Sequence, residues 1–82
     1  MSERLTLRVK AVMAVTFNTT EEQIGDDASI MQTPGWDSLG HASLMLALEE
    51  EFGVELSEEA ILELQSLPEI VAHLTPRVQP DG

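Results

Sequence analysis

The chain has 82 residues and a formal net charge of -11, with 15 acidic residues against four lysines and arginines. This length supports one domain with a modest core, and a hydrophobic share of 43% is too high for a typical disordered acidic tail. The acidic balance disfavours direct binding to nucleic acid. The absence of cysteine excludes disulfides and thiolate metal sites.

No apolar run approaches the roughly 20 residues that a membrane span needs. The opening residues, MSERLTLRVK, lack the apolar block of a signal peptide. We therefore expect a cytoplasmic protein that binds neither nucleic acid nor membrane, and we expect it to be a monomer. The negative charge is compatible with plain solubility and also with steering toward partners that carry basic patches.

The first predicted element is a helix over residues 3–17. Apolar residues recur there at spacings of three and four, which predicts one buried face formed by Leu5, Val9, Val12, Met13 and Phe17. Thr20 and Gln23 then have the spacing of a capping box for a short turn, with Ile24 as its buried anchor.

Residues 25–36 contain turn formers, among them Pro34 and Gly35, and predict a long loop. We expect Ala28 and Ile30 to tie this loop to the core. Loops of such length in compact domains often carry function.

The second predicted helix begins at Asp37 or Ser38 and ends near Phe52. Asp37 suits the helix cap, because its side chain can accept a backbone N–H and its charge complements the helix dipole. Gly53 is a natural stop signal.

A short third helix is predicted over residues 57–64 with Ser57 as its cap, and a fourth over residues 67–74 with Ser66 and Glu69 as its capping box. No segment alternates with a period of two. The expected fold is all-α: a small bundle of three longer helices and one short helix, with a long loop between the first two helices.

The second helix is too apolar for a single buried stripe. The residues spaced four apart, which we assign to the core, are Leu44, Leu48 and Phe52. A neighbouring stripe, with Met45 near its edge, consists of Leu39, Ala42 and Leu46. This second stripe either forms an exposed docking surface rimmed by acids or is buried by packing on two sides.

Ser38 lies at the junction of the loop and the second helix, where a serine alone usually acts as a cap. A catalytic nucleophile needs a positioned base. His41 is one helical turn away, but no G-x-S-x-G elbow accompanies it, so the sequence argues against an enzyme. His41 and His73 lack the spacing of metal ligands and the acids of the loop do not match an EF-hand, so no metal site is expected.

The stretch Asp37-Ser38-Leu39, followed by Leu44 and by Ala47-Leu48-Glu49-Glu50-Glu51-Phe52, resembles the acyl carrier protein family. The resemblance covers nearly the whole chain. Weaker matches in the same order are Glu21-Glu22-Gln23-Ile24, Asp27-Ala28-Ser29-Ile30 and a final helix that opens near Leu67. The tripeptide alone is uninformative, whereas the tripeptide with the helix and spacing that follow it is specific.

The resemblance implies an acyl carrier domain over residues 1–76, followed by a loose tail over residues 77–82. Ser38 would carry a covalent 4′-phosphopantetheine arm, which a phosphopantetheinyl transferase attaches from coenzyme A with Mg²⁺. The thiol of the arm would hold an acyl group as a thioester, and the protein would shuttle that group between enzymes of fatty-acid or polyketide type without catalysing a reaction.

The implied partners are the transferase and the acyl-loading and acyl-processing enzymes, which would present basic docking patches. The residues implied in partner recognition are Asp37, Leu39, Met45, Leu46, Glu49 and Glu50.

This sequence departs from many fatty-acid carriers in two ways. Gly40 and Ser43 stand where those carriers have acids, which favours a specialised pathway. Trp36 and His41 also differ. Trp36 either packs beside the arm or covers the helix end, and we favour a structural packing role. We expect His41 to be an exposed helix residue, with a contact to the arm or to a partner as the alternative. Two alternatives stay open, namely an aminoacyl or peptidyl carrier and a non-carrier acidic helical module that docks a basic partner.

Overall fold

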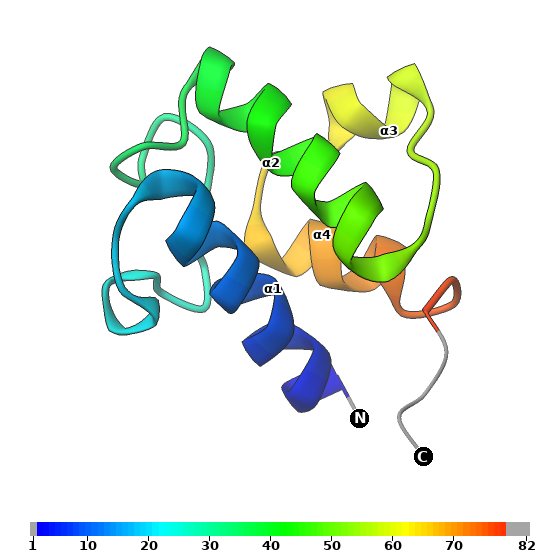
Figure 1. The fold of residues 1–82 in the computed structure, drawn as a ribbon, viewed down its shortest axis with the longest axis horizontal. Helices are drawn as coiled ribbons and strands as arrows, with labels where there is room; N and C mark the ends of the chain where they lie inside the picture. The colour runs from blue at the N-terminus through cyan, green and yellow to red at the C-terminus, as the bar shows by residue number, and fades with distance from the viewer. Residues whose placement is uncertain (1, 79–82) are drawn as a thin grey trace.

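A computed structural model describes residues 2–78 of the chain (Figure 1). Within this range the elements are four α-helices and one 3-10 turn, without a strand: α1 (Ser2–Phe17), η1 (Glu21–Gln23), α2 (Ser38–Phe52), α3 (Glu58–Glu63) and α4 (Leu67–Leu74). The predicted all-α fold, with a long loop between the first two helices, is confirmed. In the predicted tail, the N–H groups of Arg77 and Val78 donate to the Leu74 carbonyl, and residues 79–82 lie outside the described residues.

The helix ends follow the capping residues that the sequence supplies. Asp37 accepts the N–H of Gly40 at the start of α2, and Gly53 ends that helix in the left-handed region with a φ of 64°. The side chains of Ser57 and Ser66 cap α3 and α4 in the same way. The predicted starts of these three helices are therefore confirmed to within one residue.

The predicted capping box before η1 is wrong. The Thr20 side chain makes no capping hydrogen bond. The Gln23 side chain instead accepts a hydrogen bond from the Thr19 hydroxyl at 2.7 Å. The turn is anchored by burial, because Ile24 directly after it is almost completely enclosed, as predicted.

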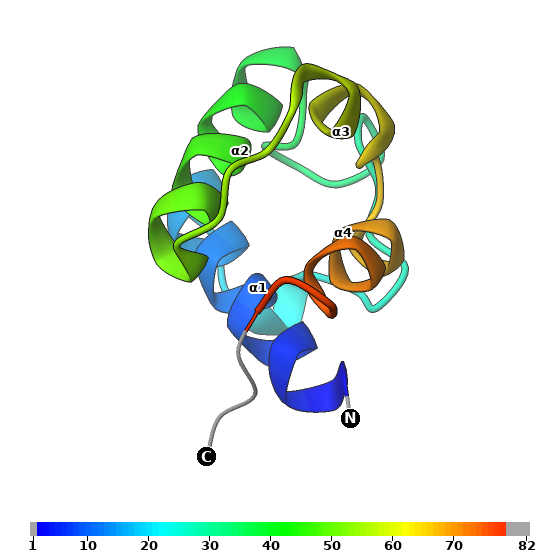
Figure 2. The same ribbon diagram turned by 90° about the vertical axis from the view of Figure 1, so that its right-hand side faces the viewer.

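The helices enclose one cluster of buried side chains, to which α1, α2 and α4 contribute most. Figure 2 shows α3 and α4 on the side of the molecule opposite to α2. The buried hydrophobic residues are Val9, Met13, Ala14, Ile24, Ala28, Trp36, Leu44, Met45, Leu48, Leu56, Ala60, Leu64, Leu67, Ile70, Val71 and Leu74. Ala28 and the half-buried Ile30 join the long loop to this core, as expected from the sequence.

The two apolar stripes of α2 have different environments. Leu44 and Leu48 have no exposed surface, and Phe52 is half-buried under the Arg8 guanidinium, whose carbon lies 4.6 Å from the ring centre. Leu39 and Leu46 are 83% and 63% exposed. The second stripe is therefore a surface feature, and the interpretation that packing on two sides buries it is wrong.

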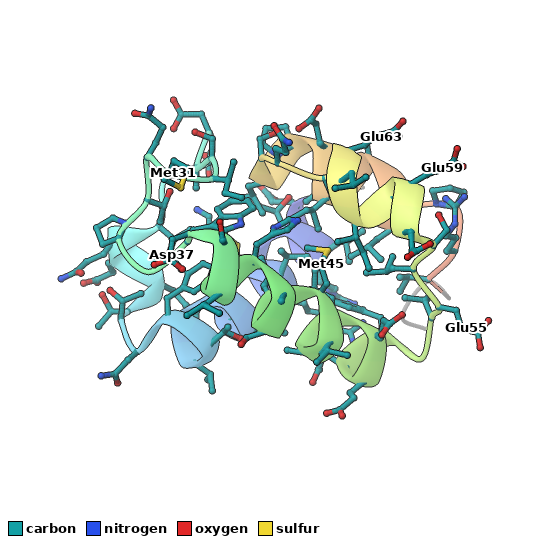
Figure 3. The ribbon with its side chains drawn as sticks, turned by 90° about the horizontal axis from the view of Figure 1, so that it is seen from above. Met31, Asp37, Met45, Glu55, Glu59 and Glu63 are labelled. Atoms are coloured by element: carbon teal, nitrogen blue, oxygen red, sulfur yellow. The ribbon has the colours of Figure 1, made fainter. Side chains whose placement is uncertain are left out.

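Met45 differs from its expected place at the edge of the exposed stripe. It is only 2% exposed, and Figure 3 shows it between α2 and α3. Met45 follows His41 by four residues and so shares its helix face. The Ile61 carbonyl of α3 contacts the His41 ring, which shows that α3 covers this face. Met45 is therefore a core residue and offers no free surface for partner recognition.

Alanine substitutions at Leu48 and Leu46 should separate the two stripes. Because Leu48 is fully buried, Leu48→Ala should lower the free energy of unfolding by about 2–5 kcal/mol. Leu46→Ala should change it by less than about 0.5 kcal/mol, because most of the side chain already contacts water. Urea unfolding followed by circular dichroism measures both, and a large loss at Leu46 would contradict the assignment.

Candidate functional site

Ser38 is the first residue of α2 and is exposed to solvent. Asp37 precedes it as the helix cap, and the Asp37 Oδ1 atom accepts the Gly40 N–H at 2.8 Å. In the described range the Ser38 hydroxyl makes no hydrogen bond. The free hydroxyl thus lies at the N-terminus of α2. The positive end of the helix dipole there stabilises an anionic group that is bound to this oxygen.

The loop before Ser38 is tied to the connection between α3 and α4. The Ile30 N–H donates to the Gln65 carbonyl, and the Leu67 N–H donates to the Ala28 carbonyl, each at 2.8 Å. These two bonds form an isolated antiparallel bridge between segments far apart in the sequence. The loop is therefore held in place although it contains no long regular element.

Two glycines allow the end of this loop to pass close to α1 and α2. Gly35 has a φ of 91°, and a Cβ atom on it would lie 2.7 Å from the Phe17 Cβ. A Cβ atom on Gly40 would lie only 1.9 Å from the Gly35 carbonyl oxygen. Real Cβ atoms do not approach backbone oxygen so closely, so any side chain at either position requires the backbone to move.

Trp36 anchors the loop directly before the cap of α2. Its side chain is completely buried, and its ring stacks on Phe17 with centroids 6.0 Å apart and on His41 with centroids 6.1 Å apart. The structural role expected for Trp36 is confirmed. The indole N–H donates to His41 Nδ1 at 2.9 Å, so the polar atom of this buried ring has its partner.

His41 is buried, so its prediction as an exposed helix residue is wrong. The ring fills the space between Trp36 and α3, and its Nε2 lies 2.6 Å from the Ile61 carbonyl oxygen. Both ring nitrogens are therefore occupied. His41 was the nearest candidate base for Ser38, and it does not serve as one in this arrangement.

The other residues expected at a partner face have different exposures. Asp37, Leu39, Leu46 and Glu50 are exposed. Glu49 is half-buried, because its Oε2 atom accepts the Leu56 N–H at 2.8 Å and so holds the chain after α2. Glu49 thus contacts the backbone after α2, whereas its neighbour Glu51 pairs with Arg8 at 3.7 Å.

Besides Leu7 and Val15 of α1, two apolar side chains that sequence analysis did not single out are exposed. Met31 in the loop is 71% exposed, and Leu62 in α3 is 72% exposed. Figure 3 shows Met31 at the same end of the molecule as Asp37. A signal for Leu62 existed, because Ile61 and Leu62 are adjacent on a helix and only one of them can face the core. No sequence pattern indicated the exposure of Met31, because its backbone conformation, with a φ of 68°, depends on how the loop packs in the tertiary structure.

Acidic side chains surround α3. Glu55, Glu59 and Glu63 are exposed, and Figure 3 shows them directed outward. Among residues 2–78 no group of three or more acids and histidines has the arrangement of a metal site. In the same range no helix has the length and apolar character to cross a membrane.

The sequence matches the family model described as "Phosphopantetheine attachment site" over residues 7–74. This match spans most of the chain and includes all of α2, α3 and α4. The chain therefore belongs to the phosphopantetheine-attachment family and is a phosphopantetheine carrier. Members of this family carry a covalent 4′-phosphopantetheine group, and they interact with a phosphopantetheinyl transferase and with partner enzymes.

The start of α2 fits this group. The Ser38 hydroxyl is exposed and makes no hydrogen bond within the described range, and the helix N-terminus favours the phosphodiester anion that attachment creates. The exposed Leu39 and Met31 side chains leave apolar surface nearby, which suits the organic part of such an arm.

Substitution of Gly40 tests the close approach of the loop to α2. Gly40→Ala should lower the free energy of unfolding by about 1–3 kcal/mol, because the new Cβ atom displaces the Gly35 peptide. This loss should exceed the gain of up to about 1 kcal/mol that alanine ordinarily brings inside a helix. Chemical denaturation measures the difference.

Gly25→Ala is the matched control. Its Cβ atom would have as nearest neighbour the Asp27 Oδ1 atom at 3.1 Å, which belongs to an exposed side chain that can rotate away. We expect this variant to change stability by less than about 1 kcal/mol. Equal, small effects of the two substitutions would show that the Gly35–Gly40 contact is not tight.

Proposed function

We propose that Ser38 carries the 4′-phosphopantetheine arm and that the protein is an acyl carrier. In the attachment step, the Ser38 oxygen forms a bond to the β-phosphorus of coenzyme A. The pyrophosphate bond breaks, adenosine 3′,5′-bisphosphate leaves, and the transferase takes up the hydroxyl proton. Once attached, the thiol of the arm holds an acyl group as a thioester, while the protein presents that group and leaves catalysis to its partner enzymes.

The observation that carries this proposal is the free, exposed hydroxyl of Ser38 at the start of α2. Other serines have different roles. The Ser57 and Ser66 hydroxyls are engaged in capping α3 and α4. Ser43 is exposed but lies within α2, where no free helix N–H groups are available to an anion.

The surface beside Ser38 supports a carrier for a specialised pathway. Many fatty-acid carriers have an acid at the position of Gly40, and the Gly35 carbonyl leaves no room for a side chain there. Ser43 replaces a second such acid. General fatty-acid enzymes that use those acids would find only part of their contact surface. The net charge of -11 favours an acyl carrier over an aminoacyl or peptidyl carrier.

The carrier domain is proposed to extend over residues 1–76. All four helices end by Leu74, and Thr75 forms the last helical cap. Of the tail, Val78 is half-buried and packs against the core.

Transfer from coenzyme A tests the attachment site. Incubation with coenzyme A, Mg²⁺ and a broad-specificity phosphopantetheinyl transferase should increase the intact mass by one phosphopantetheinyl group, and Ser38→Ala should abolish the increase. Ser43→Ala is the control and should still be loaded. A wild-type protein that gains no mass would favour the non-carrier interaction module, and a gain that survives Ser38→Ala would place the arm elsewhere.

A charge on the exposed stripe of α2 tests partner docking. Leu46→Glu should raise the KM of the transferase for the carrier by about tenfold, because an apolar contact is replaced by a buried charge. Circular dichroism should show unchanged helicity. Leu7→Glu is the control, since Leu7 is 55% exposed on α1 and lies beside Pro68 and Ala72 of α4. An equal rise in both variants would mean that added charge, and not the α2 surface, changes docking.

A further inference from the structure

Trp36 and His41 form a buried chain of hydrogen bonds that joins three parts of the fold. The Trp36 indole, at the end of the loop, donates to His41 Nδ1 of α2 at 2.9 Å. The His41 Nε2 atom lies 2.6 Å from the carbonyl oxygen of Ile61 in α3. Ser38 lies between the two ring-bearing residues in the sequence, yet its own side chain forms none of these bonds.

Which atom donates and which accepts in this chain of hydrogen bonds follows from the chemistry of the groups. An indole nitrogen can only donate, so His41 Nδ1 must accept and carries no proton. A carbonyl oxygen can only accept, so the proton of the neutral ring is on Nε2 and is donated to Ile61. This arrangement satisfies every polar atom of the two rings, and in the described range no buried side-chain nitrogen or oxygen atom lacks a partner.

The Ile61 carbonyl needs this donor because α3 ends there. In a longer helix the carbonyl would accept the N–H of Gln65, four residues later. Here the Gln65 N–H donates to the Glu63 carbonyl and to Glu69 Oε1. His41 therefore supplies, from α2, the hydrogen bond that the short helix α3 cannot supply itself.

We infer that His41 is a positioning residue for Ser38. Through Trp36 it holds the end of the loop, and through Ile61 it holds α3, so the start of α2 is fixed on both sides while the Ser38 hydroxyl stays free. The inference rests on the proposed attachment of the arm to Ser38. A transferase that requires one placement of Ser38 will bind a carrier with a looser loop more weakly, in proportion to the fraction of molecules in the competent conformation.

The experiment compares transfer kinetics of wild-type protein with those of His41→Leu, which fills the place of the ring with an apolar side chain and removes both hydrogen bonds. The transferase KM for the carrier should rise by about tenfold, whereas kcat should stay within about twofold of wild type. His41→Gln retains an acceptor and a donor, so its KM should lie closer to the wild-type value than that of His41→Leu. Trp36→Phe removes the indole donor together with part of the buried ring, and it should also raise the KM.

Three further measurements separate positioning from general stability. Val9→Ala removes buried volume in α1, eight residues and about 12 Å along the helix from Phe17. It should reduce stability and leave the KM of the folded protein unchanged. In the Trp36→Phe/His41→Leu double variant, the KM should resemble that of His41→Leu, because His41→Leu has already removed the bond between the two rings. The chain has one tryptophan, so the NMR signal of its indole proton should exchange faster with solvent in His41→Leu.

The outcomes distinguish the inference from the function on which it rests. Wild-type protein that is not loaded at all overturns the proposed function together with the inference. If wild-type protein is loaded and His41→Leu has an unchanged KM, the inference alone is overturned. The same holds if the KM increases of the two single variants multiply in the double variant. If His41→Leu is unfolded by circular dichroism, Trp36→Phe carries the test: a raised KM supports the inference and an unchanged KM overturns it.

Discussion

The complete burial of Trp36 is the constraint on which the start of α2 depends. The indole packs between Phe17 of α1 and His41 of α2, so the loop cannot leave this position without exposing a large aromatic ring. Gly35, directly before it, has a left-handed backbone and passes close to both helices. Asp37, directly after it, caps α2. Core packing thereby determines the position of the exposed Ser38 side chain.

This arrangement resolves a conflict that every carrier of a covalent arm must meet. Ser38, the proposed attachment residue, has to be accessible to enzymes, yet it must keep a defined position. Buried groups on both sides of Ser38 supply the rigidity, while its own hydroxyl takes part in no hydrogen bond within the described range. The same separation extends along α2, where Leu44 and Leu48 face the core and Leu39 and Leu46 face solvent.

The departures of this sequence from common fatty-acid carriers have a structural basis. The Gly35 carbonyl leaves no room for a Cβ atom at residue 40, which accounts for glycine at this position. Trp36 and His41 belong to the same packing arrangement. The exposed surface beside Ser38 therefore depends on the buried contacts of its neighbours.

The sequence by itself determined the helices and the family, because caps, stop signals and apolar spacing are local properties. It predicted α4 at its observed bounds, α2 from its cap Asp37 to Gly53, and the resemblance centred on Ser38. Only the tertiary structure decided the roles of Met45, His41 and Gly40. The first two are buried because α3 covers their face of α2, and Gly40 is needed because the loop before α2 folds so that the Gly35 carbonyl approaches it. Such contacts depend on how elements pack in space, which periodicity along one helix does not encode.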